Sequence, residues 1–339
     1  MIEQKKHIEY LDVLKGIAIF FVIAGHSLHW EQSSSYSPIN DVYFNLINIF
    51  HVPIFFWVSG FLLVGKEYNE GTTLSTLWRR FYTLIVPLVT FSVFNYFVLD
   101  IPFKSPWFLG TLFEAIVINT FYEFIRFKYK LGRGWDFSFY ALAYIGINVI
   151  AGLHNPIEER FLSFQSLAGQ HYLVFCFGCI CRRYDLVKKL LDKNIVYTLS
   201  LLIFSSLFIS CDILQVFHVY GRIHAALGAL SGVVCIKYIC KNTSLIGGGI
   251  KKFFTLIGKY SLELYLLHGY FKIYIPGTRT LINNLANGTI EEKLCSMSIQ
   301  ILSSSFITIF NIGLCLIVLH IIRTSNIFSI LFLGRKNHN

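Results

Sequence analysis

The chain has few charged residues, few prolines and no polar low-complexity tract. Asp, Glu, Lys and Arg together make up 14% of its 339 residues, and there are only 7 prolines. An average soluble domain has about 25% charged residues. The G-x-S-x-G motif of nucleophile elbows and the phosphate-binding P-loop are also missing. These absences argue against a soluble enzyme and a disordered chain.

Apolar residues dominate instead, at 55% of the chain, and aromatic residues reach 17%. The mean hydropathy is +0.58. A helix needs about 20 mostly apolar residues to cross a bilayer. Ten segments fit this requirement, although 107–121 and 166–181 are short enough to be tilted, partial or re-entrant. The ten are 10–29, 43–64, 81–99, 107–121, 136–152, 166–181, 195–214, 222–240, 253–272 and 299–322. We therefore predict an all-α, polytopic membrane protein with about ten transmembrane helices, forming a single domain over residues 1–339.

The net charge of +10 and the isoelectric point near 9.1 need a physical explanation. With ten spans and both termini in the cytoplasm, the inner loops and ends hold 20 of the Lys and Arg residues, and the outer side holds 6. This bias is the positive-inside rule of membrane proteins. The basic charge thus predicts both termini in the cytoplasm and a lipid bilayer as partner. It does not indicate a nucleic acid.

Ionisable residues inside a membrane span are costly and are therefore candidates for function. The first span contains Asp12, Lys15 and His26. Lys15 and His26 are eleven residues apart, which is three helical turns and about 16 Å of rise, so they share one face. Taken alone, Lys15 is explained as an interfacial anchor, and His26 as a histidine bonded to a neighbour. As a pair on one polar stripe, they favour a functional role.

The ninth segment, 253–272, carries a second intramembrane histidine, His268. The predicted topology puts it near the outer end, at a depth similar to that of His26. Histidines in an outward-facing cavity exchange protons near neutral pH. The histidines and cysteines lack the close spacing of a metal site, so we expect no metal.

Several segments resemble the motifs of the acyltransferase-3 family, the integral-membrane O-acyltransferases. The first two carry the highest specificity: residues 10–27 (YLDVLKGIAIFFVIAGHS), with a basic residue and a histidine eleven positions later, and residues 50–62 (FHVPIFFWVSGFL). Later segments are also similar, namely 106–109 (PWFL), 112–113 (LF), 175–178 (FCFG) and 260–268 (YSLELYLLH). The details are closest to the polysaccharide and sugar O-acetylase branch.

The resemblance implies transfer of an acyl group, most simply acetyl, from cytoplasmic acetyl-CoA to a hydroxyl of a cell-surface or exported glycan. It implies a multi-pass protein of the bacterial inner membrane. His26 is then the general base or, as a second option, an acyl carrier. Lys15, paired with Asp12, orients the donor. The expected substrate channel contains Ser59, Gly60, His51 and His268.

Arg79 and Arg80 are the residues expected to bind the phosphates of the donor, because guanidinium groups pair well with phosphate. One departure from the family pattern occurs here. Family members often carry a second arginine three residues after the first, where this chain has Thr83.

Two other classes of function stay open from the sequence alone. Ten spans with buried charges also suit a transporter or a flippase of a glycan or lipid-linked glycan, although no inverted repeat is visible. A catalytically silent, partner-binding membrane protein is the other option.

Overall fold

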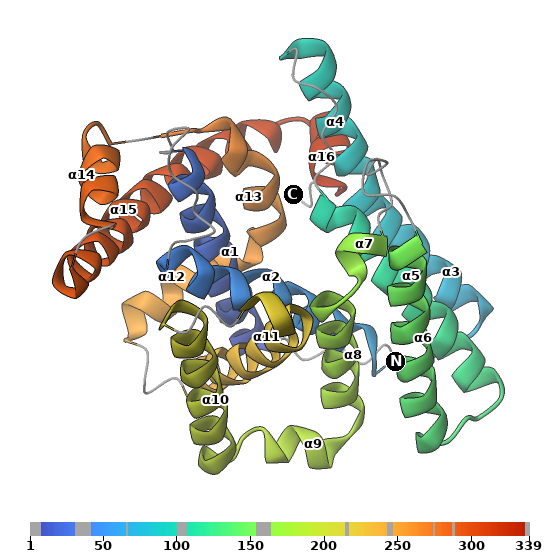
Figure 1. Ribbon diagram of the computed structural model, residues 1–339. Helices are drawn as coiled ribbons and strands as arrows, with labels where there is room; N and C mark the ends of the chain where they lie inside the picture. Colours follow the sequence, from blue (N-terminus) through green and yellow to red (C-terminus); the bar gives the residue numbers. More distant parts are fainter. Residues whose placement is uncertain are drawn as a thin grey trace. The chain divides into compact units, whose positions relative to one another are not determined.

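The computed structural model describes residues 8–30, 42–65, 67–99, 107–153, 164–213, 217–242, 247–273, 275–286 and 289–335. Within these ranges every regular element is a helix, and no strand occurs (Figure 1). This confirms the all-α class. Pro106, the first residue of the 106–109 motif, lies outside the described residues.

Among the described residues, six helical segments are long and apolar enough to cross a membrane. They are formed by α1 (Glu9–Trp30), α2 (Val42–Leu63), the continuous run of α3 (Glu70–Arg80), η2 (Phe81–Ile85) and α4 (Val86–Val98), α5 (Trp107–Lys128), α6 (Arg133–Leu153) and α15 (Ile290–Ile322). Two more expected spans coincide with the helices α10 (Asn194–Ile213) and α11 (Phe217–Lys241). The protein is therefore a multi-pass membrane protein.

The structure interrupts two of the expected segments: 253–272, which was predicted as one span, and 166–181, which was short enough to be partial or re-entrant. In 166–181, the short α7 (Phe164–Leu167) is separated from α8 (Gln170–Arg183) by a turn in which Gly169 has φ +74°. Gly169 is the residue directly before α8, and its positive φ is a conformation that glycine adopts far more readily than other residues. In 253–272, α12 (Gly248–Lys259) stops at Tyr260, whose ψ of 15° leaves the helical region, before α13 (Ser261–Leu267) and the 3₁₀ turn η5 (His268–Tyr270). Three further short helices were not expected: α9 (Asp185–Leu190), α14 (Thr278–Ala286) and α16 (Asn326–Leu333).

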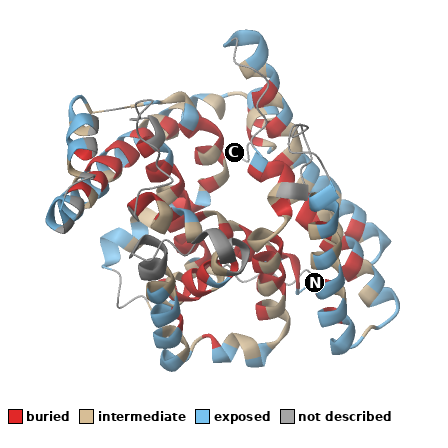
Figure 2. Ribbon diagram, in the orientation of Figure 1, coloured by how far each residue is buried: buried red, intermediate tan, exposed pale blue. Residues whose placement is uncertain are grey.

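Large apolar side chains are exposed along the helices that are long enough to span. Figure 2 shows α6 exposed over most of its length, with Leu142 at 69%, and Phe306 of α15 is 65% exposed. In water such surfaces would be costly. They suit contact with lipid chains, which are as apolar as the side chains themselves.

The described helices fall into two compact units, and both are discontinuous in sequence. The first comprises Met1–Phe55, Asn194–Tyr220 and Leu227–Leu319. The second comprises Phe56–Lys193, Gly221–Ala226 and His320–Asn339. Because the chain passes between the units several times, no single cut separates them.

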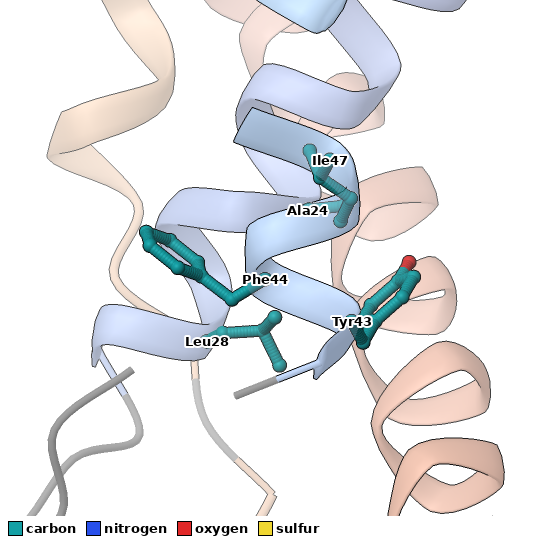
Figure 3. Close-up of a cluster of buried hydrophobic side chains, with 5 residues drawn as sticks. All are labelled: Ala24, Leu28, Tyr43, Phe44 and Ile47. Carbon is teal, nitrogen blue, oxygen red and sulfur yellow. The ribbon is translucent and has the colours of Figure 1, made fainter. Parts of the chain in front are cut away.

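In the first unit, the end of α1 packs on the start of α2. Ala24 and Leu28 of α1 meet Tyr43, Phe44 and Ile47 of α2 in a buried cluster (Figure 3). The Tyr43 hydroxyl also lies 3.3 Å from the hydroxyl of Ser304 on α15. Ala24 and Leu28 lie two residues before and two residues after His26, so the cluster holds this part of α1 against α2.

The first half of α1 is held by α12, with which it makes a close crossing. A Cβ atom at Gly258 would lie 1.8 Å from the carbonyl oxygen of Asp12, and one at Gly16 would lie 2.0 Å from that of Phe254. Only glycine permits this approach at either position, as is typical of close helix pairs in membranes. At the end of the same pair, Lys251 Nζ lies 2.8 Å from Glu9 Oε2.

In the second unit, the run from α3 to α4 contains one turn of π-helix, η2. A capping box starts the run: Asn69 Oδ1 accepts from the Thr72 amide at 2.9 Å, and Thr72 Oγ1 accepts from the Asn69 amide at 2.8 Å. Further along, Pro87 has no N–H for the carbonyl of Thr83 four residues earlier, and its ring would clash with that carbonyl. The wider turn accommodates the proline, with the Val86 amide donating to the carbonyl of Phe81.

Candidate functional site: a histidine pair and an arginine cluster

Two histidines from distant parts of the chain form a pair in the first unit. His26 projects from the second half of α1, and His268 lies where α13 passes into η5. Their Nδ1 (His26) and Nε2 (His268) atoms are 2.7 Å apart. His268 is 4% exposed, whereas His26 is exposed. One imidazole is thus accessible and the other forms a buried support behind it.

The hydrogen bonds of His268 determine the tautomers of both rings. His268 Nδ1 lies 2.7 Å from the carbonyl oxygen of Tyr265 and 3.2 Å from that of Leu264. A carbonyl only accepts, so His268 Nδ1 carries the proton, and Nε2 of the neutral ring is an acceptor. His26 then donates from Nδ1, and its Nε2 carries the lone pair. We assign this arrangement from the hydrogen-bond network.

The turn that presents His268 is supported by Asn311 of α15, which is completely buried. Its Nδ2 donates to the carbonyl oxygens of His268 and Phe271, at 3.0 and 2.8 Å. The His268 carbonyl also accepts from the Phe271 amide at 3.2 Å, and the Phe271 carbonyl lies just beyond the end of η5, where helical partners run out. Sequence reasoning missed Asn311. A buried amide in an otherwise apolar span was the available signal.

Lys15 and Asp12 form an ion pair on α1, with Lys15 Nζ 2.8 Å from Asp12 Oδ1. The Lys15 side chain is 24% exposed, whereas Asp12 is nearly buried. Both Lys15 and His26 are less buried than the residues beside them, such as Leu14 and Gly25. This pattern agrees with the polar stripe expected along α1. About 16 Å of helix rise separates Lys15 from His26, so the two side chains lie at different depths along α1.

The remaining expected channel residues have different surroundings. His51 is buried, and its Nδ1 lies 2.7 Å from the carbonyl oxygen of Ile47, one turn earlier on α2. Ser59 is half-buried. Gly60 lies in a close contact with α8, where an added Cβ would be 2.1 Å from the carbonyl oxygen of Phe175. Packing alone accounts for this glycine. A channel role for these three residues stays a prediction.

Arg79 and Arg80 end α3 in the second unit, immediately before the π turn η2. Arg79 is exposed and Arg80 is half-buried. Among the described residues, the Nε atom of Arg80 is buried and has no hydrogen-bond partner. Thr83, inside η2, donates from Oγ1 to the carbonyl oxygen of Arg80 at 3.4 Å. A guanidinium with an unused donor is suited to binding an oxyanion.

Tyr68 lies near these two arginines, just before α3. It is 4% exposed, and its hydroxyl donates to the carbonyl oxygen of Leu63 at 2.9 Å. Burial, together with the charge of Glu123, raises the pKa of Tyr68 far above its usual value, while Arg80 and Arg79 act in the opposite direction. The phenol is therefore neutral and does not cancel the charge of the arginines.

A second charged cluster in this unit, the buried ion network, joins α5, α6 and α8. Arg183 pairs with Glu123 and, at 2.5 Å, with Asp136. Asp136 also lies 3.0 Å from Arg126 Nε. Tyr122 and Tyr184 both donate to Asp136. The charge of Arg183 is thus neutralised inside the protein.

No three or more His, Cys, Asp or Glu side chains converge as a metal site would require, within the part of the chain that the structure describes. An exposed imidazole with its lone pair on Nε2 and its other nitrogen hydrogen-bonded has the arrangement of a general base.

The helices define a multi-pass membrane protein with paired histidines in one unit and an arginine cluster in the other. A family model described as an acyltransferase domain matches residues 8–320. The chain therefore belongs to the acyltransferase-3 family, as its motifs predicted, and is a membrane acyltransferase. No significantly similar protein was found among the curated proteins, and none among the solved structures.

Proposed function

We propose that the protein transfers an acetyl group from cytoplasmic acetyl-CoA to a hydroxyl of a cell-surface or exported glycan, in the inner membrane of a bacterium. The observation that carries this proposal is the contact of 2.7 Å between exposed His26 and buried His268. The family supplies the reaction class. The resemblance to the sugar O-acetylase branch supports the acetyl group and the glycan acceptor, and the basic residues of the loops predicted to be cytoplasmic support an anionic donor on that side.

In the proposed reaction, His26 Nε2 takes the proton of the acceptor hydroxyl while the hydroxyl oxygen attacks the thioester carbonyl. The C–O bond of the new ester forms and the C–S bond of the thioester breaks. The proton passes from His26 to the departing sulfur, so that free CoA and the acetylated glycan are released. His268 Nε2 accepts from His26 Nδ1 throughout and stabilises the imidazolium when it forms.

The charged residues serve the donor in this proposal. Arg79 and Arg80 bind its phosphates, since each presents a fork of N–H donors. Lys15 orients the pantetheine or phosphate end, and Asp12 holds the lysine in position through their ion pair. If Lys15→Ala left the affinity for acetyl-CoA unchanged, the donor role of Lys15 would be rejected.

The test of the base uses His26→Ala and His26→Gln in membrane vesicles supplied with radiolabelled acetyl-CoA. The labelled glycan fraction should fall by about 100-fold or more at equal protein levels. His320→Gln removes an exposed histidine at the end of α15 and should leave the rate unchanged. Variants of His26 that transfer at the wild-type rate would reject its assignment as the base.

The acceptor and the acyl group are tested by mass spectrometry of surface glycans from wild-type and deletion cells. Loss of one acetyl mass per modified unit in the deletion strain is the expected result. Glycans of equal mass, combined with altered export of the unmodified glycan, would instead indicate a transporter or flippase. Label that stays on the quenched protein in the absence of acceptor would identify His26 as an acyl carrier instead of a base.

A further inference from the structure

The last described turn of the chain packs against the π turn that follows Arg80. Helix α16 lies along α4 (Figure 1), and Phe332 and Phe91 meet edge to face with centroids 5.2 Å apart. Gly334, which ends α16, touches η2 so closely that a Cβ there would be 2.1 Å from the carbonyl oxygen of Tyr82 and 2.8 Å from Cα of Thr83. The end of α16 is therefore docked at the position of Thr83.

The backbone at this point is held firmly. Gly334 has φ 62°, and its amide donates to the carbonyl oxygen of Ile330 at 3.0 Å. The Arg335 amide donates to that of Ser329 at 3.3 Å. The bond to Ile330 is that of the αL cap motif, which places a left-handed residue, here Gly334, directly after the helix. Arg335 is thus fixed one residue beyond the contact with Thr83.

Arg335 adds a third positive charge to the cluster of Arg79 and Arg80. The charges of Arg79 and Arg335 both act on Arg80. Three like charges repel one another unless an anion binds between them. The unpartnered Nε of Arg80 offers such an anion a buried donor. A phosphate matches this combination of charge and hydrogen-bond geometry.

We propose that Arg335, together with Arg79 and Arg80, binds a phosphate group of the CoA donor. Arg335 supplies from the end of α16 the cation that the family often has at the position of Thr83. This proposal rests on the proposed function, because that function names the donor. It goes further by assigning a role to a residue outside the range 8–320 that the family model matches. It also explains how the donor site keeps its positive charge although position 83 is a threonine.

The test measures binding of CoA to the purified full-length protein in nanodiscs. Arg335→Gln should weaken CoA binding by about tenfold, the effect of losing one charged hydrogen bond, and Arg335→Lys should lose less. Arg323→Gln is the matched control, because it removes a positive charge from the segment between α15 and α16 and should leave binding unchanged. In the double variant Thr83→Arg with Arg335→Gln, the new arginine should restore most of the affinity.

A lipid headgroup carries the same phosphate chemistry, so the binding is measured in nanodiscs with and without anionic phosphatidylglycerol. An effect of Arg335→Gln on CoA binding in purely zwitterionic nanodiscs supports the donor site. Equal CoA affinity of Arg335→Gln and wild type in those nanodiscs overturns it, and so does an equal loss in the Arg323→Gln control.

The proposed function fails separately from this inference. If wild-type protein binds CoA with an affinity that depends on Arg335 but transfers no acyl group, the phosphate site is supported and the proposed reaction is rejected. If wild-type protein transfers acetyl normally but its CoA affinity does not depend on Arg335, the reaction is supported and the phosphate site is rejected.

Discussion

His26 Nδ1 lies 2.7 Å from His268 Nε2, although 242 residues separate the two histidines in sequence. The pair joins an exposed ring on α1 to a buried ring at the end of α13. The buried ring is itself oriented by backbone carbonyls, and its backbone by Asn311. This chain of hydrogen bonds gives the accessible imidazole a defined tautomer, which a general base requires.

The role of His268 is tested by comparing His268→Ala with His268→Gln. Alanine removes the acceptor for His26 Nδ1, and we expect acetyl transfer to fall between about tenfold and 100-fold. The glutamine carbonyl oxygen can replace that acceptor and should restore part of the rate. CoA affinity should stay unchanged in both variants. A wild-type rate in His268→Ala, with normal thermal unfolding, would contradict the proposed pairing.

The close crossing of α1 and α12 predicts that Gly258→Ala destabilises the protein. The new methyl would meet the Asp12 carbonyl at 1.8 Å, and forcing the backbones apart should cost about 1–3 kcal/mol. Gly249→Ala is the matched control on the same helix, because nothing lies within 4 Å of its added Cβ. Thermal unfolding in detergent measures both. Equal stability of the two variants would show that the helices do not meet as described.

The buried ion network predicts a large effect of Arg183→Met. The change leaves Glu123 and Asp136, both almost completely buried, without their shared cation, and breaking such a pair costs about 3–5 kcal/mol. Lys189→Met removes an exposed positive charge nearby and should have little effect. The measurement is the unfolding temperature of the purified variants. An Arg183→Met protein as stable as Lys189→Met would contradict the network.

The raised pKa of the Tyr184 phenol predicts that the protein loses stability at high pH. Its burial, and then its hydrogen bond to Asp136, raise the pKa of Tyr184 to about 12, whereas a tyrosine in an unfolded chain titrates near pH 10. The folded state favours the protonated phenol. Its contribution is therefore complete below about pH 10 and is lost as the pH rises through about 12.

The measurement for Tyr184 is the difference in unfolding free energy between wild type and Tyr184→Phe as a function of pH. Other tyrosines cancel in this difference. It should be constant at lower pH and shrink over the range from about pH 10 to about pH 12. A difference that stays constant across that range would show that the Asp136 contact does not favour the phenol.

Much of the helical architecture was predictable, because long apolar runs leave few alternatives in a bilayer. The expected spans 10–29 and 43–64 agree closely with α1 and α2. The segments 166–181 and 253–272 are interrupted instead, the first at a turn in which Gly169 has a positive φ and the second at Tyr260. Neither interruption changes the hydropathy that predicted the spans. Helix α16 has only eight residues and was too short for a hydropathy signal.

The sequence by itself determined the class of protein and the family, since composition, charge bias and the motifs around His26 and Ser59 are local properties of the chain. It also contained Lys15 and Asp12 as a pair, because residues three apart on a helix are neighbours. Only the tertiary structure decided that His268 supports His26, that Asn311 holds the turn beneath it, and that Gly334 places Arg335 beside the π turn. Such contacts join residues far apart in the chain, and they depend on how closely the helices approach one another, which no periodicity in the sequence encodes.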